Sequence, residues 1–339
     1  EIPSGPAVRR VSLTDVGVTH NTRDGILSAK TGGYHRIEGC VISDNGQYGL
    51  NVHQFLRSVI RNCEIRGNGT GLRPAWSWYI VVEGNRIHHN RAGGLLIDSC
   101  YNSSVSGNLI HANGSFGLSI YYLARRNTIK ENILIRNAAG INIDLHWGGF
   151  GENRIYHNDL IENRDQVRWV PTGESRFQLW DMGEATGGNY WLDHSGRNTE
   201  RAGAAGTPYD LAGGARDRYP LRMPHGRIRA ELSVERGGPG GPGPEEWLTT
   251  HIELPAGLSL EDIDRTTLRL AGQVPMAEAM VSEGDVDEDG IPDLEVRFLV
   301  PDLRRIREGP GAGREFVVTG SLKCGLLFEA REISKGVDR

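Results

Sequence analysis

The densest group of ligand-type side chains is an acidic loop, Asp285-Val-Asp-Glu-Asp-Gly-Ile-Pro-Asp293. Aspartates at loop positions 1, 3, 5 and 9 with glycine at position 6 are typical of a hard-oxygen Ca²⁺ loop. The helix-loop-helix version has Glu at position 12, where this chain has Val296. The loop instead resembles the Asp-rich loops between strands of extracellular β domains. The alternative is an acidic turn without metal. Four carboxylates this close repel one another without a cation, so we expect Ca²⁺ bound by Asp285, Asp287, Asp289, Asp293 and the carbonyl of Ile291.

A histidine pair is the second candidate metal site. His88 and His111 occupy equivalent outward positions in neighbouring copies of the repeat described below, and His89 follows the first. Two imidazoles about 5 Å apart suit Cu or Zn. The sequence shows no third ligand, so a solvated pair is the preferred interpretation.

Polar and aromatic side chains recur with the same repeat and predict a sugar-binding face. Aromatic rings stack on the apolar faces of sugars, while charged and amide groups bind hydroxyls. The alternative is that these side chains pack beneath connecting loops. The candidate carbohydrate-binding residues are His53, Arg73, Trp76, Trp78, Asp98, Tyr121 and Trp147.

Catalysis is a sharper hypothesis on the same face. Asp98 and Asp144 lie two repeats apart with Tyr121 between them, which predicts about 9–10 Å between the carboxylates. That spacing is at the wide end for an inverting glycosidase pair. A lyase would instead use His53, Arg73 and Tyr121. Solvated carboxylates are far commoner, so we expect a protein that is not an enzyme.

An internal repeat must position all of these side chains. Its last asparagine recurs at positions 21, 45, 68, 90, 113, 137 and 163. Apolar and polar residues alternate inside each copy, which is strand periodicity. Strands this short bury their apolar faces only by stacking, one coil on the next. Stacking predicts ladders of asparagines such as Asn85, Asn108 and Asn132. Cys40 and Cys63 replace asparagine in that ladder, either as a disulfide or as buried thiols.

A glycine followed by an aliphatic residue comes shortly after each recurring asparagine, as at Gly49-Leu50 and Gly94-Leu95. We expect these glycines to adopt positive φ where the chain turns. Leucine-rich repeats need a pattern that is absent, and propeller blades are about twice as long. The sequence therefore predicts a parallel β-helix of about seven coils.

The end of the repeat carries a distinctive segment: Thr186-Gly-Gly-Asn-Tyr-Trp191, Asp193, Thr207-Pro-Tyr209, Gly213-Gly214, Asp217 and Tyr219-Pro-Leu221. Together with the coils it resembles the NosD-like, carbohydrate-binding and sugar-hydrolase type of right-handed parallel β-helix, over residues 8 to about 222. The resemblance implies the fold. Functions in such families range from copper-protein maturation to surface binding and polysaccharide chemistry. Residues 192–206 depart from the family by lacking an acidic stretch, which weakens any metal role for that loop.

A second domain follows. Residues 236–245 are rich in glycine and proline and are typical of a linker. Alternating runs such as Thr267–Leu270 and Leu294–Phe298 predict short strands. We expect a β-helix over residues 1–235 with a closing segment at 186–222, and a β-sandwich-like domain over 246–339.

The charge and hydropathy of the chain argue against two classes of partner, nucleic acids and the interior of a membrane. The net charge of −5 argues against nucleic-acid binding, and no apolar run is long enough for a membrane helix. The first residues are not a signal peptide, so an exported form would be a mature chain or a fragment. We expect a secreted, cell-surface or periplasmic binding protein that contacts a polysaccharide or copies of itself. The alternatives are a polysaccharide hydrolase or lyase and a copper-enzyme maturation factor.

Self-assembly is expected because Glu1–Arg9 offers no helix to cover the first coil. A second subunit that covered that edge would make a head-to-tail contact. Such contacts do not close on themselves and generate filaments.

Overall fold

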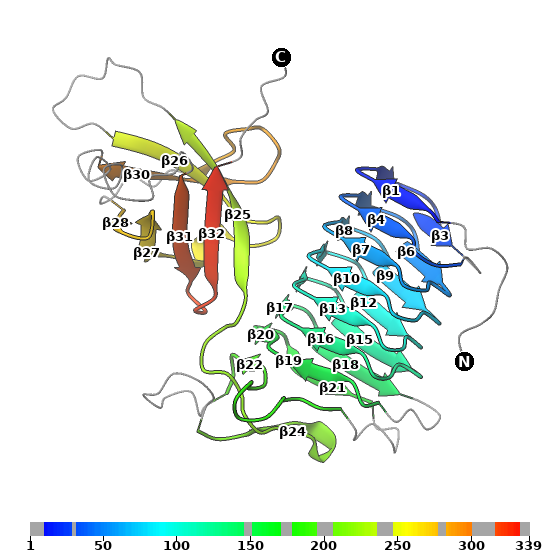
Figure 1. The fold of residues 1–339 in the computed structure, drawn as a ribbon. Coiled ribbons are helices and arrows are strands. Elements are labelled where there is room, and N and C mark those ends of the chain that lie inside the picture. The colour runs from blue at the N-terminus through cyan, green and yellow to red at the C-terminus, as the bar shows by residue number, and fades with distance from the viewer. Residues whose placement is uncertain are drawn as a thin grey trace. The chain divides into compact units, whose positions relative to one another are not determined.

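The computed structural model describes residues 10–28, 32–145, 151–170, 178–194, 206–235, 247–276, 283–299 and 316–332. The chain divides into two compact units, Glu1–Gly226 and Arg227–Arg339. Both are built from strands (Figure 1). Within the described ranges the only helices are two short 3₁₀ turns, η3 (Ala212–Gly214) and η4 (Leu260–Asp262). Neither of these two helices is long and apolar enough to span a membrane.

The first unit is a parallel β-helix with three sheets, and each complete coil contributes one strand to each sheet. Sheet I contains β1 (Ser12–Thr14), β4 (Arg36–Glu38), β7 (Val59–Arg61), β10 (Val81–Glu83), β13 (Ser104–Ser106), β16 (Thr128–Lys130) and β19 (Arg154–Tyr156). Sheet II contains β2 (Gly17–Thr19), β5 (Val41–Ser43), β8 (Glu64–Arg66), β11 (Arg86–His88), β14 (Leu109–His111), β17 (Ile133–Ile135), β20 (Asp159–Ile161) and β22 (Tyr190–Trp191). Sheet III contains β3 (Ile26–Ser28), β6 (Tyr48–His53), β9 (Thr70–Ala75), β12 (Gly93–Asp98), β15 (Phe116–Tyr122), β18 (Ala139–Leu145) and β21 (Asp165–Trp169).

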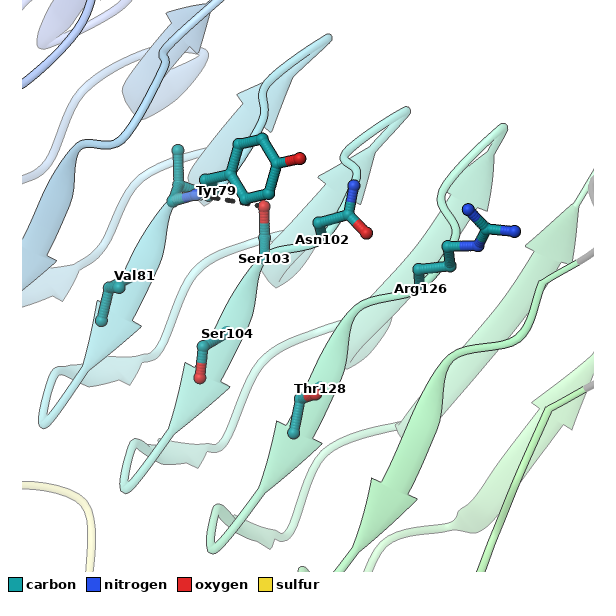
Figure 2. A pocket seen from close by; sticks show the side chains of 8 residues that line it. Tyr79, Val81, Asn102, Ser103, Ser104, Arg126 and Thr128 are labelled. Carbon is teal, nitrogen blue, oxygen red and sulfur yellow. Dashed lines mark hydrogen bonds between the residues drawn. The ribbon is translucent and has the colours of Figure 1, made fainter.

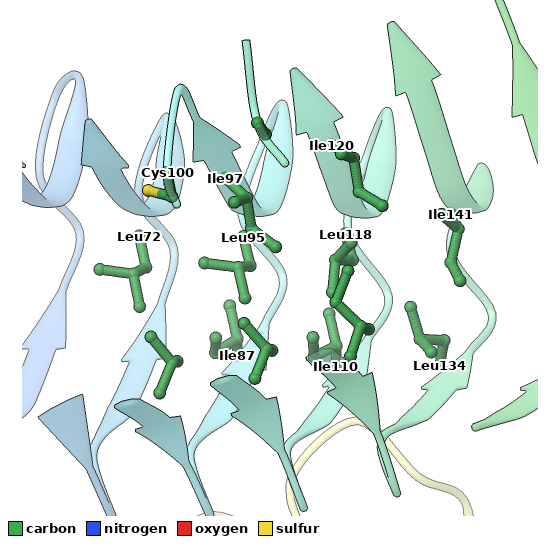
Figure 3. Packing of buried hydrophobic residues seen from close by; sticks show 14 of the residues in the cluster. Leu72, Ile87, Leu95, Ile97, Cys100, Ile110, Leu118, Ile120, Leu134 and Ile141 are labelled. Atoms are coloured by element: carbon green, nitrogen blue, oxygen red, sulfur yellow. The ribbon is translucent and has the colours of Figure 1, made fainter. Parts of the chain in front are cut away.

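Aliphatic columns fill the interior of the β-helix. Each strand points alternate side chains inward, and the parallel register places equivalent residues of successive coils beside one another. Leu95 pairs with Leu72 and Leu118 in sheet III, and Figure 3 shows the resulting stack. Opposite it lies the column of Ile87 and Ile110 in sheet II. All five side chains are fully buried, so the predicted register and core are confirmed.

Asparagine ladders run through the corners of the β-helix, as predicted. Asn85 donates from its backbone amide and its side-chain amide to Asn108 Oδ1, both at 2.9 Å. Asn108 makes the same pair of bonds to Asn132 at 3.1 and 2.8 Å. Side-chain amides also reach backbone carbonyls inside the coil, such as Asn108 Nδ2 to Val82 O at 3.0 Å. Parallel ladders pass through Asn45, Asn68, Asn90, Asn113 and Asn137 and through Asn127 and Asn153.

The recurring glycines have a different role from the predicted one. None of the six glycines at the recurring position of the repeat has a positive φ: Gly25, Gly49, Gly71, Gly94, Gly117 and Gly140. A Cβ on Gly94 would lie 2.6 Å from Gly117 O and 2.9 Å from Asn113 Nδ2. The glycine is therefore required by the close approach of the next coil and its ladder asparagine. The turns themselves place other residues at positive φ, including Asn62, Glu131 and His157.

The closing segment terminates one ladder at a carboxylate. Asn158 donates to Asn189 Oδ1 at 3.1 Å, and Asn189 in turn donates from its backbone to Asp217 Oδ2 at 2.7 Å. Trp191 Nε1 also donates to Oδ2, at 2.9 Å, and the indole stacks on Tyr209 at 4.2 Å. Every ladder member passes donors to the next coil, so the ladder must end on an acceptor oxygen. Asp217, in β24 (Arg216–Asp217) beside β23 (Tyr209–Asp210), meets that need.

The second unit forms one eight-stranded sheet in the order β28-β27-β31-β32-β25-β26-β30-β29. Its strands are β25 (Arg227–Glu235), β26 (Trp247–Glu253), β27 (Ile263–Leu270), β28 (Val274–Pro275), β29 (Glu283–Gly284), β30 (Asp293–Leu299), β31 (Val317–Leu322) and β32 (Leu327–Glu332). Alternate residues such as Leu232, Ile252 and Phe298 are buried. All eight described strands are joined edge to edge in this one sheet, whereas a sandwich would have two separate sheets.

The boundary between the units lies earlier than predicted. β25 pairs with β26 and β32, so residues 227–235 belong to the second unit and not to the β-helix. The Gly/Pro segment 236–245 lies outside the described residues. It connects two antiparallel strands of one sheet, so the division between the units falls before it. The expectation for Glu1–Arg9 also falls outside the described residues.

Candidate functional site

Three histidines converge on the outward-facing side of sheet II, where His88 and His111 are buried and His89 is exposed. His88 and His111 are paired in the register of β11 and β14, as predicted, and their rings stack in parallel with centroids 4.7 Å apart. His89 adds an edge-on ring at 5.2 Å from His88 and 5.8 Å from His111. His88 Nδ1 and His89 Nδ1 lie 2.9 Å apart. Two nitrogens bound to one metal ion at about 2 Å each would be separated by about 3 Å, so these two already have the spacing of a chelating pair.

A carboxylate orients the central histidine. His88 Nε2 lies 3.1 Å from Glu64 Oε1, and this bond lowers the pKa of Glu64. An ionised carboxylate only accepts, so Nε2 carries the hydrogen and Nδ1 of neutral His88 carries a lone pair. Carboxylate–histidine pairs of this kind support metal-bound imidazoles. Without metal, the His89 Nδ1 hydrogen can occupy the gap, and a cation would replace it.

His111 is the cluster member without a hydrogen bond. It is 1% exposed, like His88, but neither of its ring nitrogens has a hydrogen-bond partner. Burial, followed by the neighbouring His88 and His89, lowers its pKa well below the usual range. The ring is therefore neutral, which is the form that binds metals. A buried imidazole without a hydrogen bond lowers the stability of the fold. Coordination of a metal ion by His111 would offset that loss.

The sequence named His89 only as the residue after His88 and did not count it as a ligand. Successive residues of a strand point to opposite faces, so strand periodicity alone does not bring His89 to His88. Its φ of +51° breaks the alternation at the end of β11. The turn returns the ring to the same side, and the third imidazole that strand periodicity could not provide is present.

Sheet III holds the predicted catalytic and sugar-binding side chains. Its register aligns His53, Ala75, Asp98, Tyr121 and Asp144 across successive coils, as predicted. Asp98 is nearly fully buried.

An ion pair occupies the Asp98 carboxylate. Arg73 donates to Asp98 Oδ2 from Nε at 3.1 Å and from Nη2 at 2.7 Å, and Ser99 donates to Oδ1 at 3.0 Å. His53 lies beside this pair and bonds Asn51 at 3.1 Å through Nε2. Burial, together with Arg73, lowers the pKa of His53. Trp147 lies outside the described residues.

Exposed aromatic rings follow the corner between sheets III and I. Trp76 and Tyr79 are 40% and 42% exposed, whereas Trp78 stacks on Tyr101 with centroids 5.7 Å apart. Beside Tyr79 is a shallow pocket of about 360 Å³, shown in Figure 2. Its rim carries the Arg126 guanidinium and the Asn102 amide, with hydroxyls of Ser104 and Thr128 below.

The acidic loop of the second unit divides its four aspartates between two groups of carboxylates. One oxygen each from Asp285, Asp287 and Asp293 lies within 4.8 Å of the others. Glu253 forms a similar group with Asp287 and Asp289. The sequence pattern missed Glu253 because it comes from β26, where the register places it opposite Asp293. Burial and the nearby carboxylates, first Glu231, raise the pKa of Glu253 to about 7.

The ladder cysteines are free thiols. Cys40 and Cys63 are both buried and unbridged, and Cys63 Sγ lies 3.3 Å from Arg61 O. Burial raises the pKa of the Cys63 thiol to about 12. Of the two states left open by the sequence, the structure has the reduced one.

The stacked coils, the asparagine ladders and the carboxylate-capped end define a parallel β-helix protein. The family model described as "Periplasmic copper-binding protein (NosD)" matches residues 10–196, more than half of the chain. The chain belongs to the NosD family.

Two curated relatives align with about 39% of the length of this chain. The "Probable ABC transporter binding protein NosD" of Stutzerimonas stutzeri is 27% identical over 144 residues, which are 39% of this chain and 31% of the relative. The protein of the same name from Pseudomonas aeruginosa is 29% identical over 143 residues, 39% of this chain and 32% of the relative. The matched part spans about a third of each relative.

Two solved structures are similar at lower identity. The Azotobacter vinelandii mannuronan C-5 epimerase AlgE4 A-module has a TM-score of 0.32 at 18% identity, covering 50% of this chain and 65% of that one. The Dettilon tailspike protein has a TM-score of 0.34 at 12% identity, covering 85% and 63%.

Proposed function

We propose that this chain is a metal-binding β-helix module of the cell envelope, that its ligand is a copper ion, and that His88, His89 and His111 bind it. The observation that carries the proposal is the 2.9 Å separation of His88 Nδ1 and His89 Nδ1. A periplasmic location follows the description of the family, which names copper as the ligand of its members.

The donor set fits copper. Imidazole nitrogens bind Cu, Zn and Ni, and Cu²⁺ binds most tightly of the divalent first-row ions. The Glu64 bond fixes the tautomer of His88, and neutral His111 stacks beside it. Rotation of the His111 ring would direct a nitrogen toward the pair. The role is that of a NosD-like accessory factor, which holds the ion without transforming a substrate.

His89→Ala tests the proposal, because His89 is exposed and its loss should leave the fold intact. We expect the Cu²⁺ affinity measured by isothermal titration calorimetry to fall by about a hundredfold. Glu64→Gln should weaken binding by about ten- to a hundredfold, because it removes the carboxylate that orients His88.

His20→Ala, at an exposed histidine in a different turn, is the matched control and should leave the affinity unchanged. Equal affinities for the wild type and His89→Ala would refute the proposal.

Carbohydrate binding is a second candidate function, favoured by the exposed Tyr79 ring beside the polar pocket. A ring with a guanidinium and hydroxyls around it suits a sugar. The Arg73–Asp98 pair favours binding over hydrolysis, because Asp98 is already occupied as an acceptor.

The sugar hypothesis predicts retention without turnover. We expect Tyr79→Ala to reduce retention in affinity electrophoresis on acidic and neutral polysaccharides, with no products released by the wild type. Met223→Ala, at an exposed apolar residue that does not line the pocket, is the control. Release of products that Asp98→Asn abolishes would instead establish a polysaccharide-cleaving enzyme that depends on Asp98.

We also propose that the loop Asp285–Asp293 binds Ca²⁺. The supporting observation is the Asp-x-Asp-x-Asp-Gly-x-x-Asp spacing of the carboxylates in the loop. Ca²⁺ would screen their repulsion, so it should raise the melting temperature and EGTA should reverse the rise. Asp287→Asn should abolish the effect, and Glu261→Gln, at an exposed carboxylate of η4, should not. The absence of both a thermal shift and bound calcium by elemental analysis would exclude the site.

A further inference from the structure

A second group of metal-ligating side chains lies where the β-helix ends. Glu131 comes from the turn between β16 and β17, His157 from the turn between β19 and β20, and His225 from the segment after β24. Glu131 and His157 occupy equivalent corner positions of successive coils, where both have positive φ. One ligand atom from each of the three residues lies within 4.8 Å of the others. Three separate segments thus deliver a His₂Glu donor set to one point.

His157 is prepared as a ligand by its other nitrogen. Its Nε2 lies 2.6 Å from the carbonyl oxygen of Thr186. A carbonyl only accepts, so Nε2 carries the hydrogen and Nδ1 of the neutral ring carries the lone pair. Metal-bound histidines commonly donate their second N–H to a backbone carbonyl in this way. The His225 ring stacks on His157 with centroids 4.4 Å apart.

The backbone at His225 is held independently of its side chain. The amides of His225 and Gly226 donate to the two carboxylate oxygens of Asp159, each at 2.7 Å. Asp159 is fully buried. A Cβ on Gly226 would lie 2.8 Å from Ile133 Cγ1, so the chain packs tightly against sheet II. The imidazole of His225 is therefore presented from a fixed backbone.

Glu131 supplies the anionic ligand. Its Oε1 bonds Lys130 Nζ at 2.9 Å, which leaves Oε2 for a cation. Two imidazoles and one carboxylate, with a fourth position for water, form a donor set that Zn²⁺ favours.

We infer that Glu131, His157 and His225 form a second metal site, for a divalent ion of the Zn²⁺ type, which ties the last residues of the first unit to the side of the β-helix. The site shares no residue with the histidine cluster of sheet II and does not depend on the proposed copper function. Its role is structural, because bound metal joins the segment at His225 to two coil turns.

The test uses Zn²⁺ alone on the full chain, in the His89→Ala background with calcium in excess, so that the other candidate sites contribute little. We expect calorimetry to find one Zn²⁺ site, and His225→Ala to weaken it by about a hundredfold or more. Hydrogen exchange of the segment containing Gly226 should slow on Zn²⁺ addition, and only while His225 is present.

His225→Ala is suited to this test because the residue is exposed and its backbone bond to Asp159 remains. His20→Ala is the control and should bind Zn²⁺ like the parent. Glu131→Gln keeps the size of the side chain and should weaken binding without changing the melting temperature of the metal-free protein. Unchanged Zn²⁺ affinity in His225→Ala, or exchange at Gly226 that Zn²⁺ does not alter, would overturn the inference.

Discussion

Asn108→Leu is expected to destabilise the β-helix by about 3 kcal/mol or more. Leucine has the same heavy-atom branching with bulkier methyl groups, so the change removes every side-chain hydrogen bond without leaving a cavity. Asn108 Nδ2 donates to Val82 O, Ser106 O and Asn132 Oδ1 at 3.0, 3.1 and 2.8 Å. Its Oδ1 accepts the backbone and side-chain amides of Asn85. These partners are buried between coils, and each unsatisfied group costs about 1–3 kcal/mol.

The measurement is urea unfolding followed by circular dichroism. Asn142→Leu is the matched control, because it makes the same substitution on the half-buried outer face of sheet III, where Asn142 donates to Ser119 Oγ. We expect the control to lose about 1 kcal/mol or less. Equal losses in the two variants would mean that the ladder does not contribute more than an ordinary surface amide.

Asp217→Asn is expected to be the most damaging conservative change in the closing segment. Asp217 Oδ2 accepts the Asn189 amide and Trp191 Nε1, and Oδ1 accepts the Tyr219 amide at 3.1 Å. An asparagine must turn its NH₂ group toward one of these donors. The NH₂ group and the N–H donor that it faces then form no hydrogen bond and repel each other. We expect this to lower the free energy of unfolding by about 2–4 kcal/mol.

The Asp217 comparison is best made at pH 8. Burial raises the pKa of Asp217 to about 6 despite its N–H donors. At pH 8 the Asp217 side chain of the folded protein is therefore ionised, and the comparison measures the contribution of the carboxylate. Thermal unfolding should show a clear loss for Asp217→Asn. Asp210→Asn, at an exposed carboxylate of the same segment, should unfold like the wild type. Stability unchanged by Asp217→Asn would contradict the role of Asp217 as the acceptor that ends the ladder.

The ladders and the core follow from the sequence because they depend on local, periodic information. Asparagine and aliphatic positions repeat once per coil, so aligning the copies also aligns the strands. The signature Asn189, Trp191 and Asp217 was recognised as a motif, but its chemistry needed the structure. Asp217 replaces an asparagine at the end of the ladder, although it is distant in the chain.

The features that the sequence did not reveal depend on departures from periodicity. His89 joins the cluster because one residue adopts positive φ. The recurring glycines are required by the neighbouring coil, and no single copy of the repeat shows that neighbour. His225 meets Glu131 and His157 only because the chain returns along the β-helix after its last coil.

The most direct test of the copper proposal is the position of the ion in crystals of the full chain loaded with one equivalent of Cu²⁺. Anomalous scattering at the copper edge locates the metal independently of any variant. We predict a single strong peak about 2 Å from the Nδ1 atoms of His88 and His89, with the His111 ring turned toward it. A peak found only at the acidic loop or at His225, or no peak at all, would contradict the assignment of copper binding to sheet II.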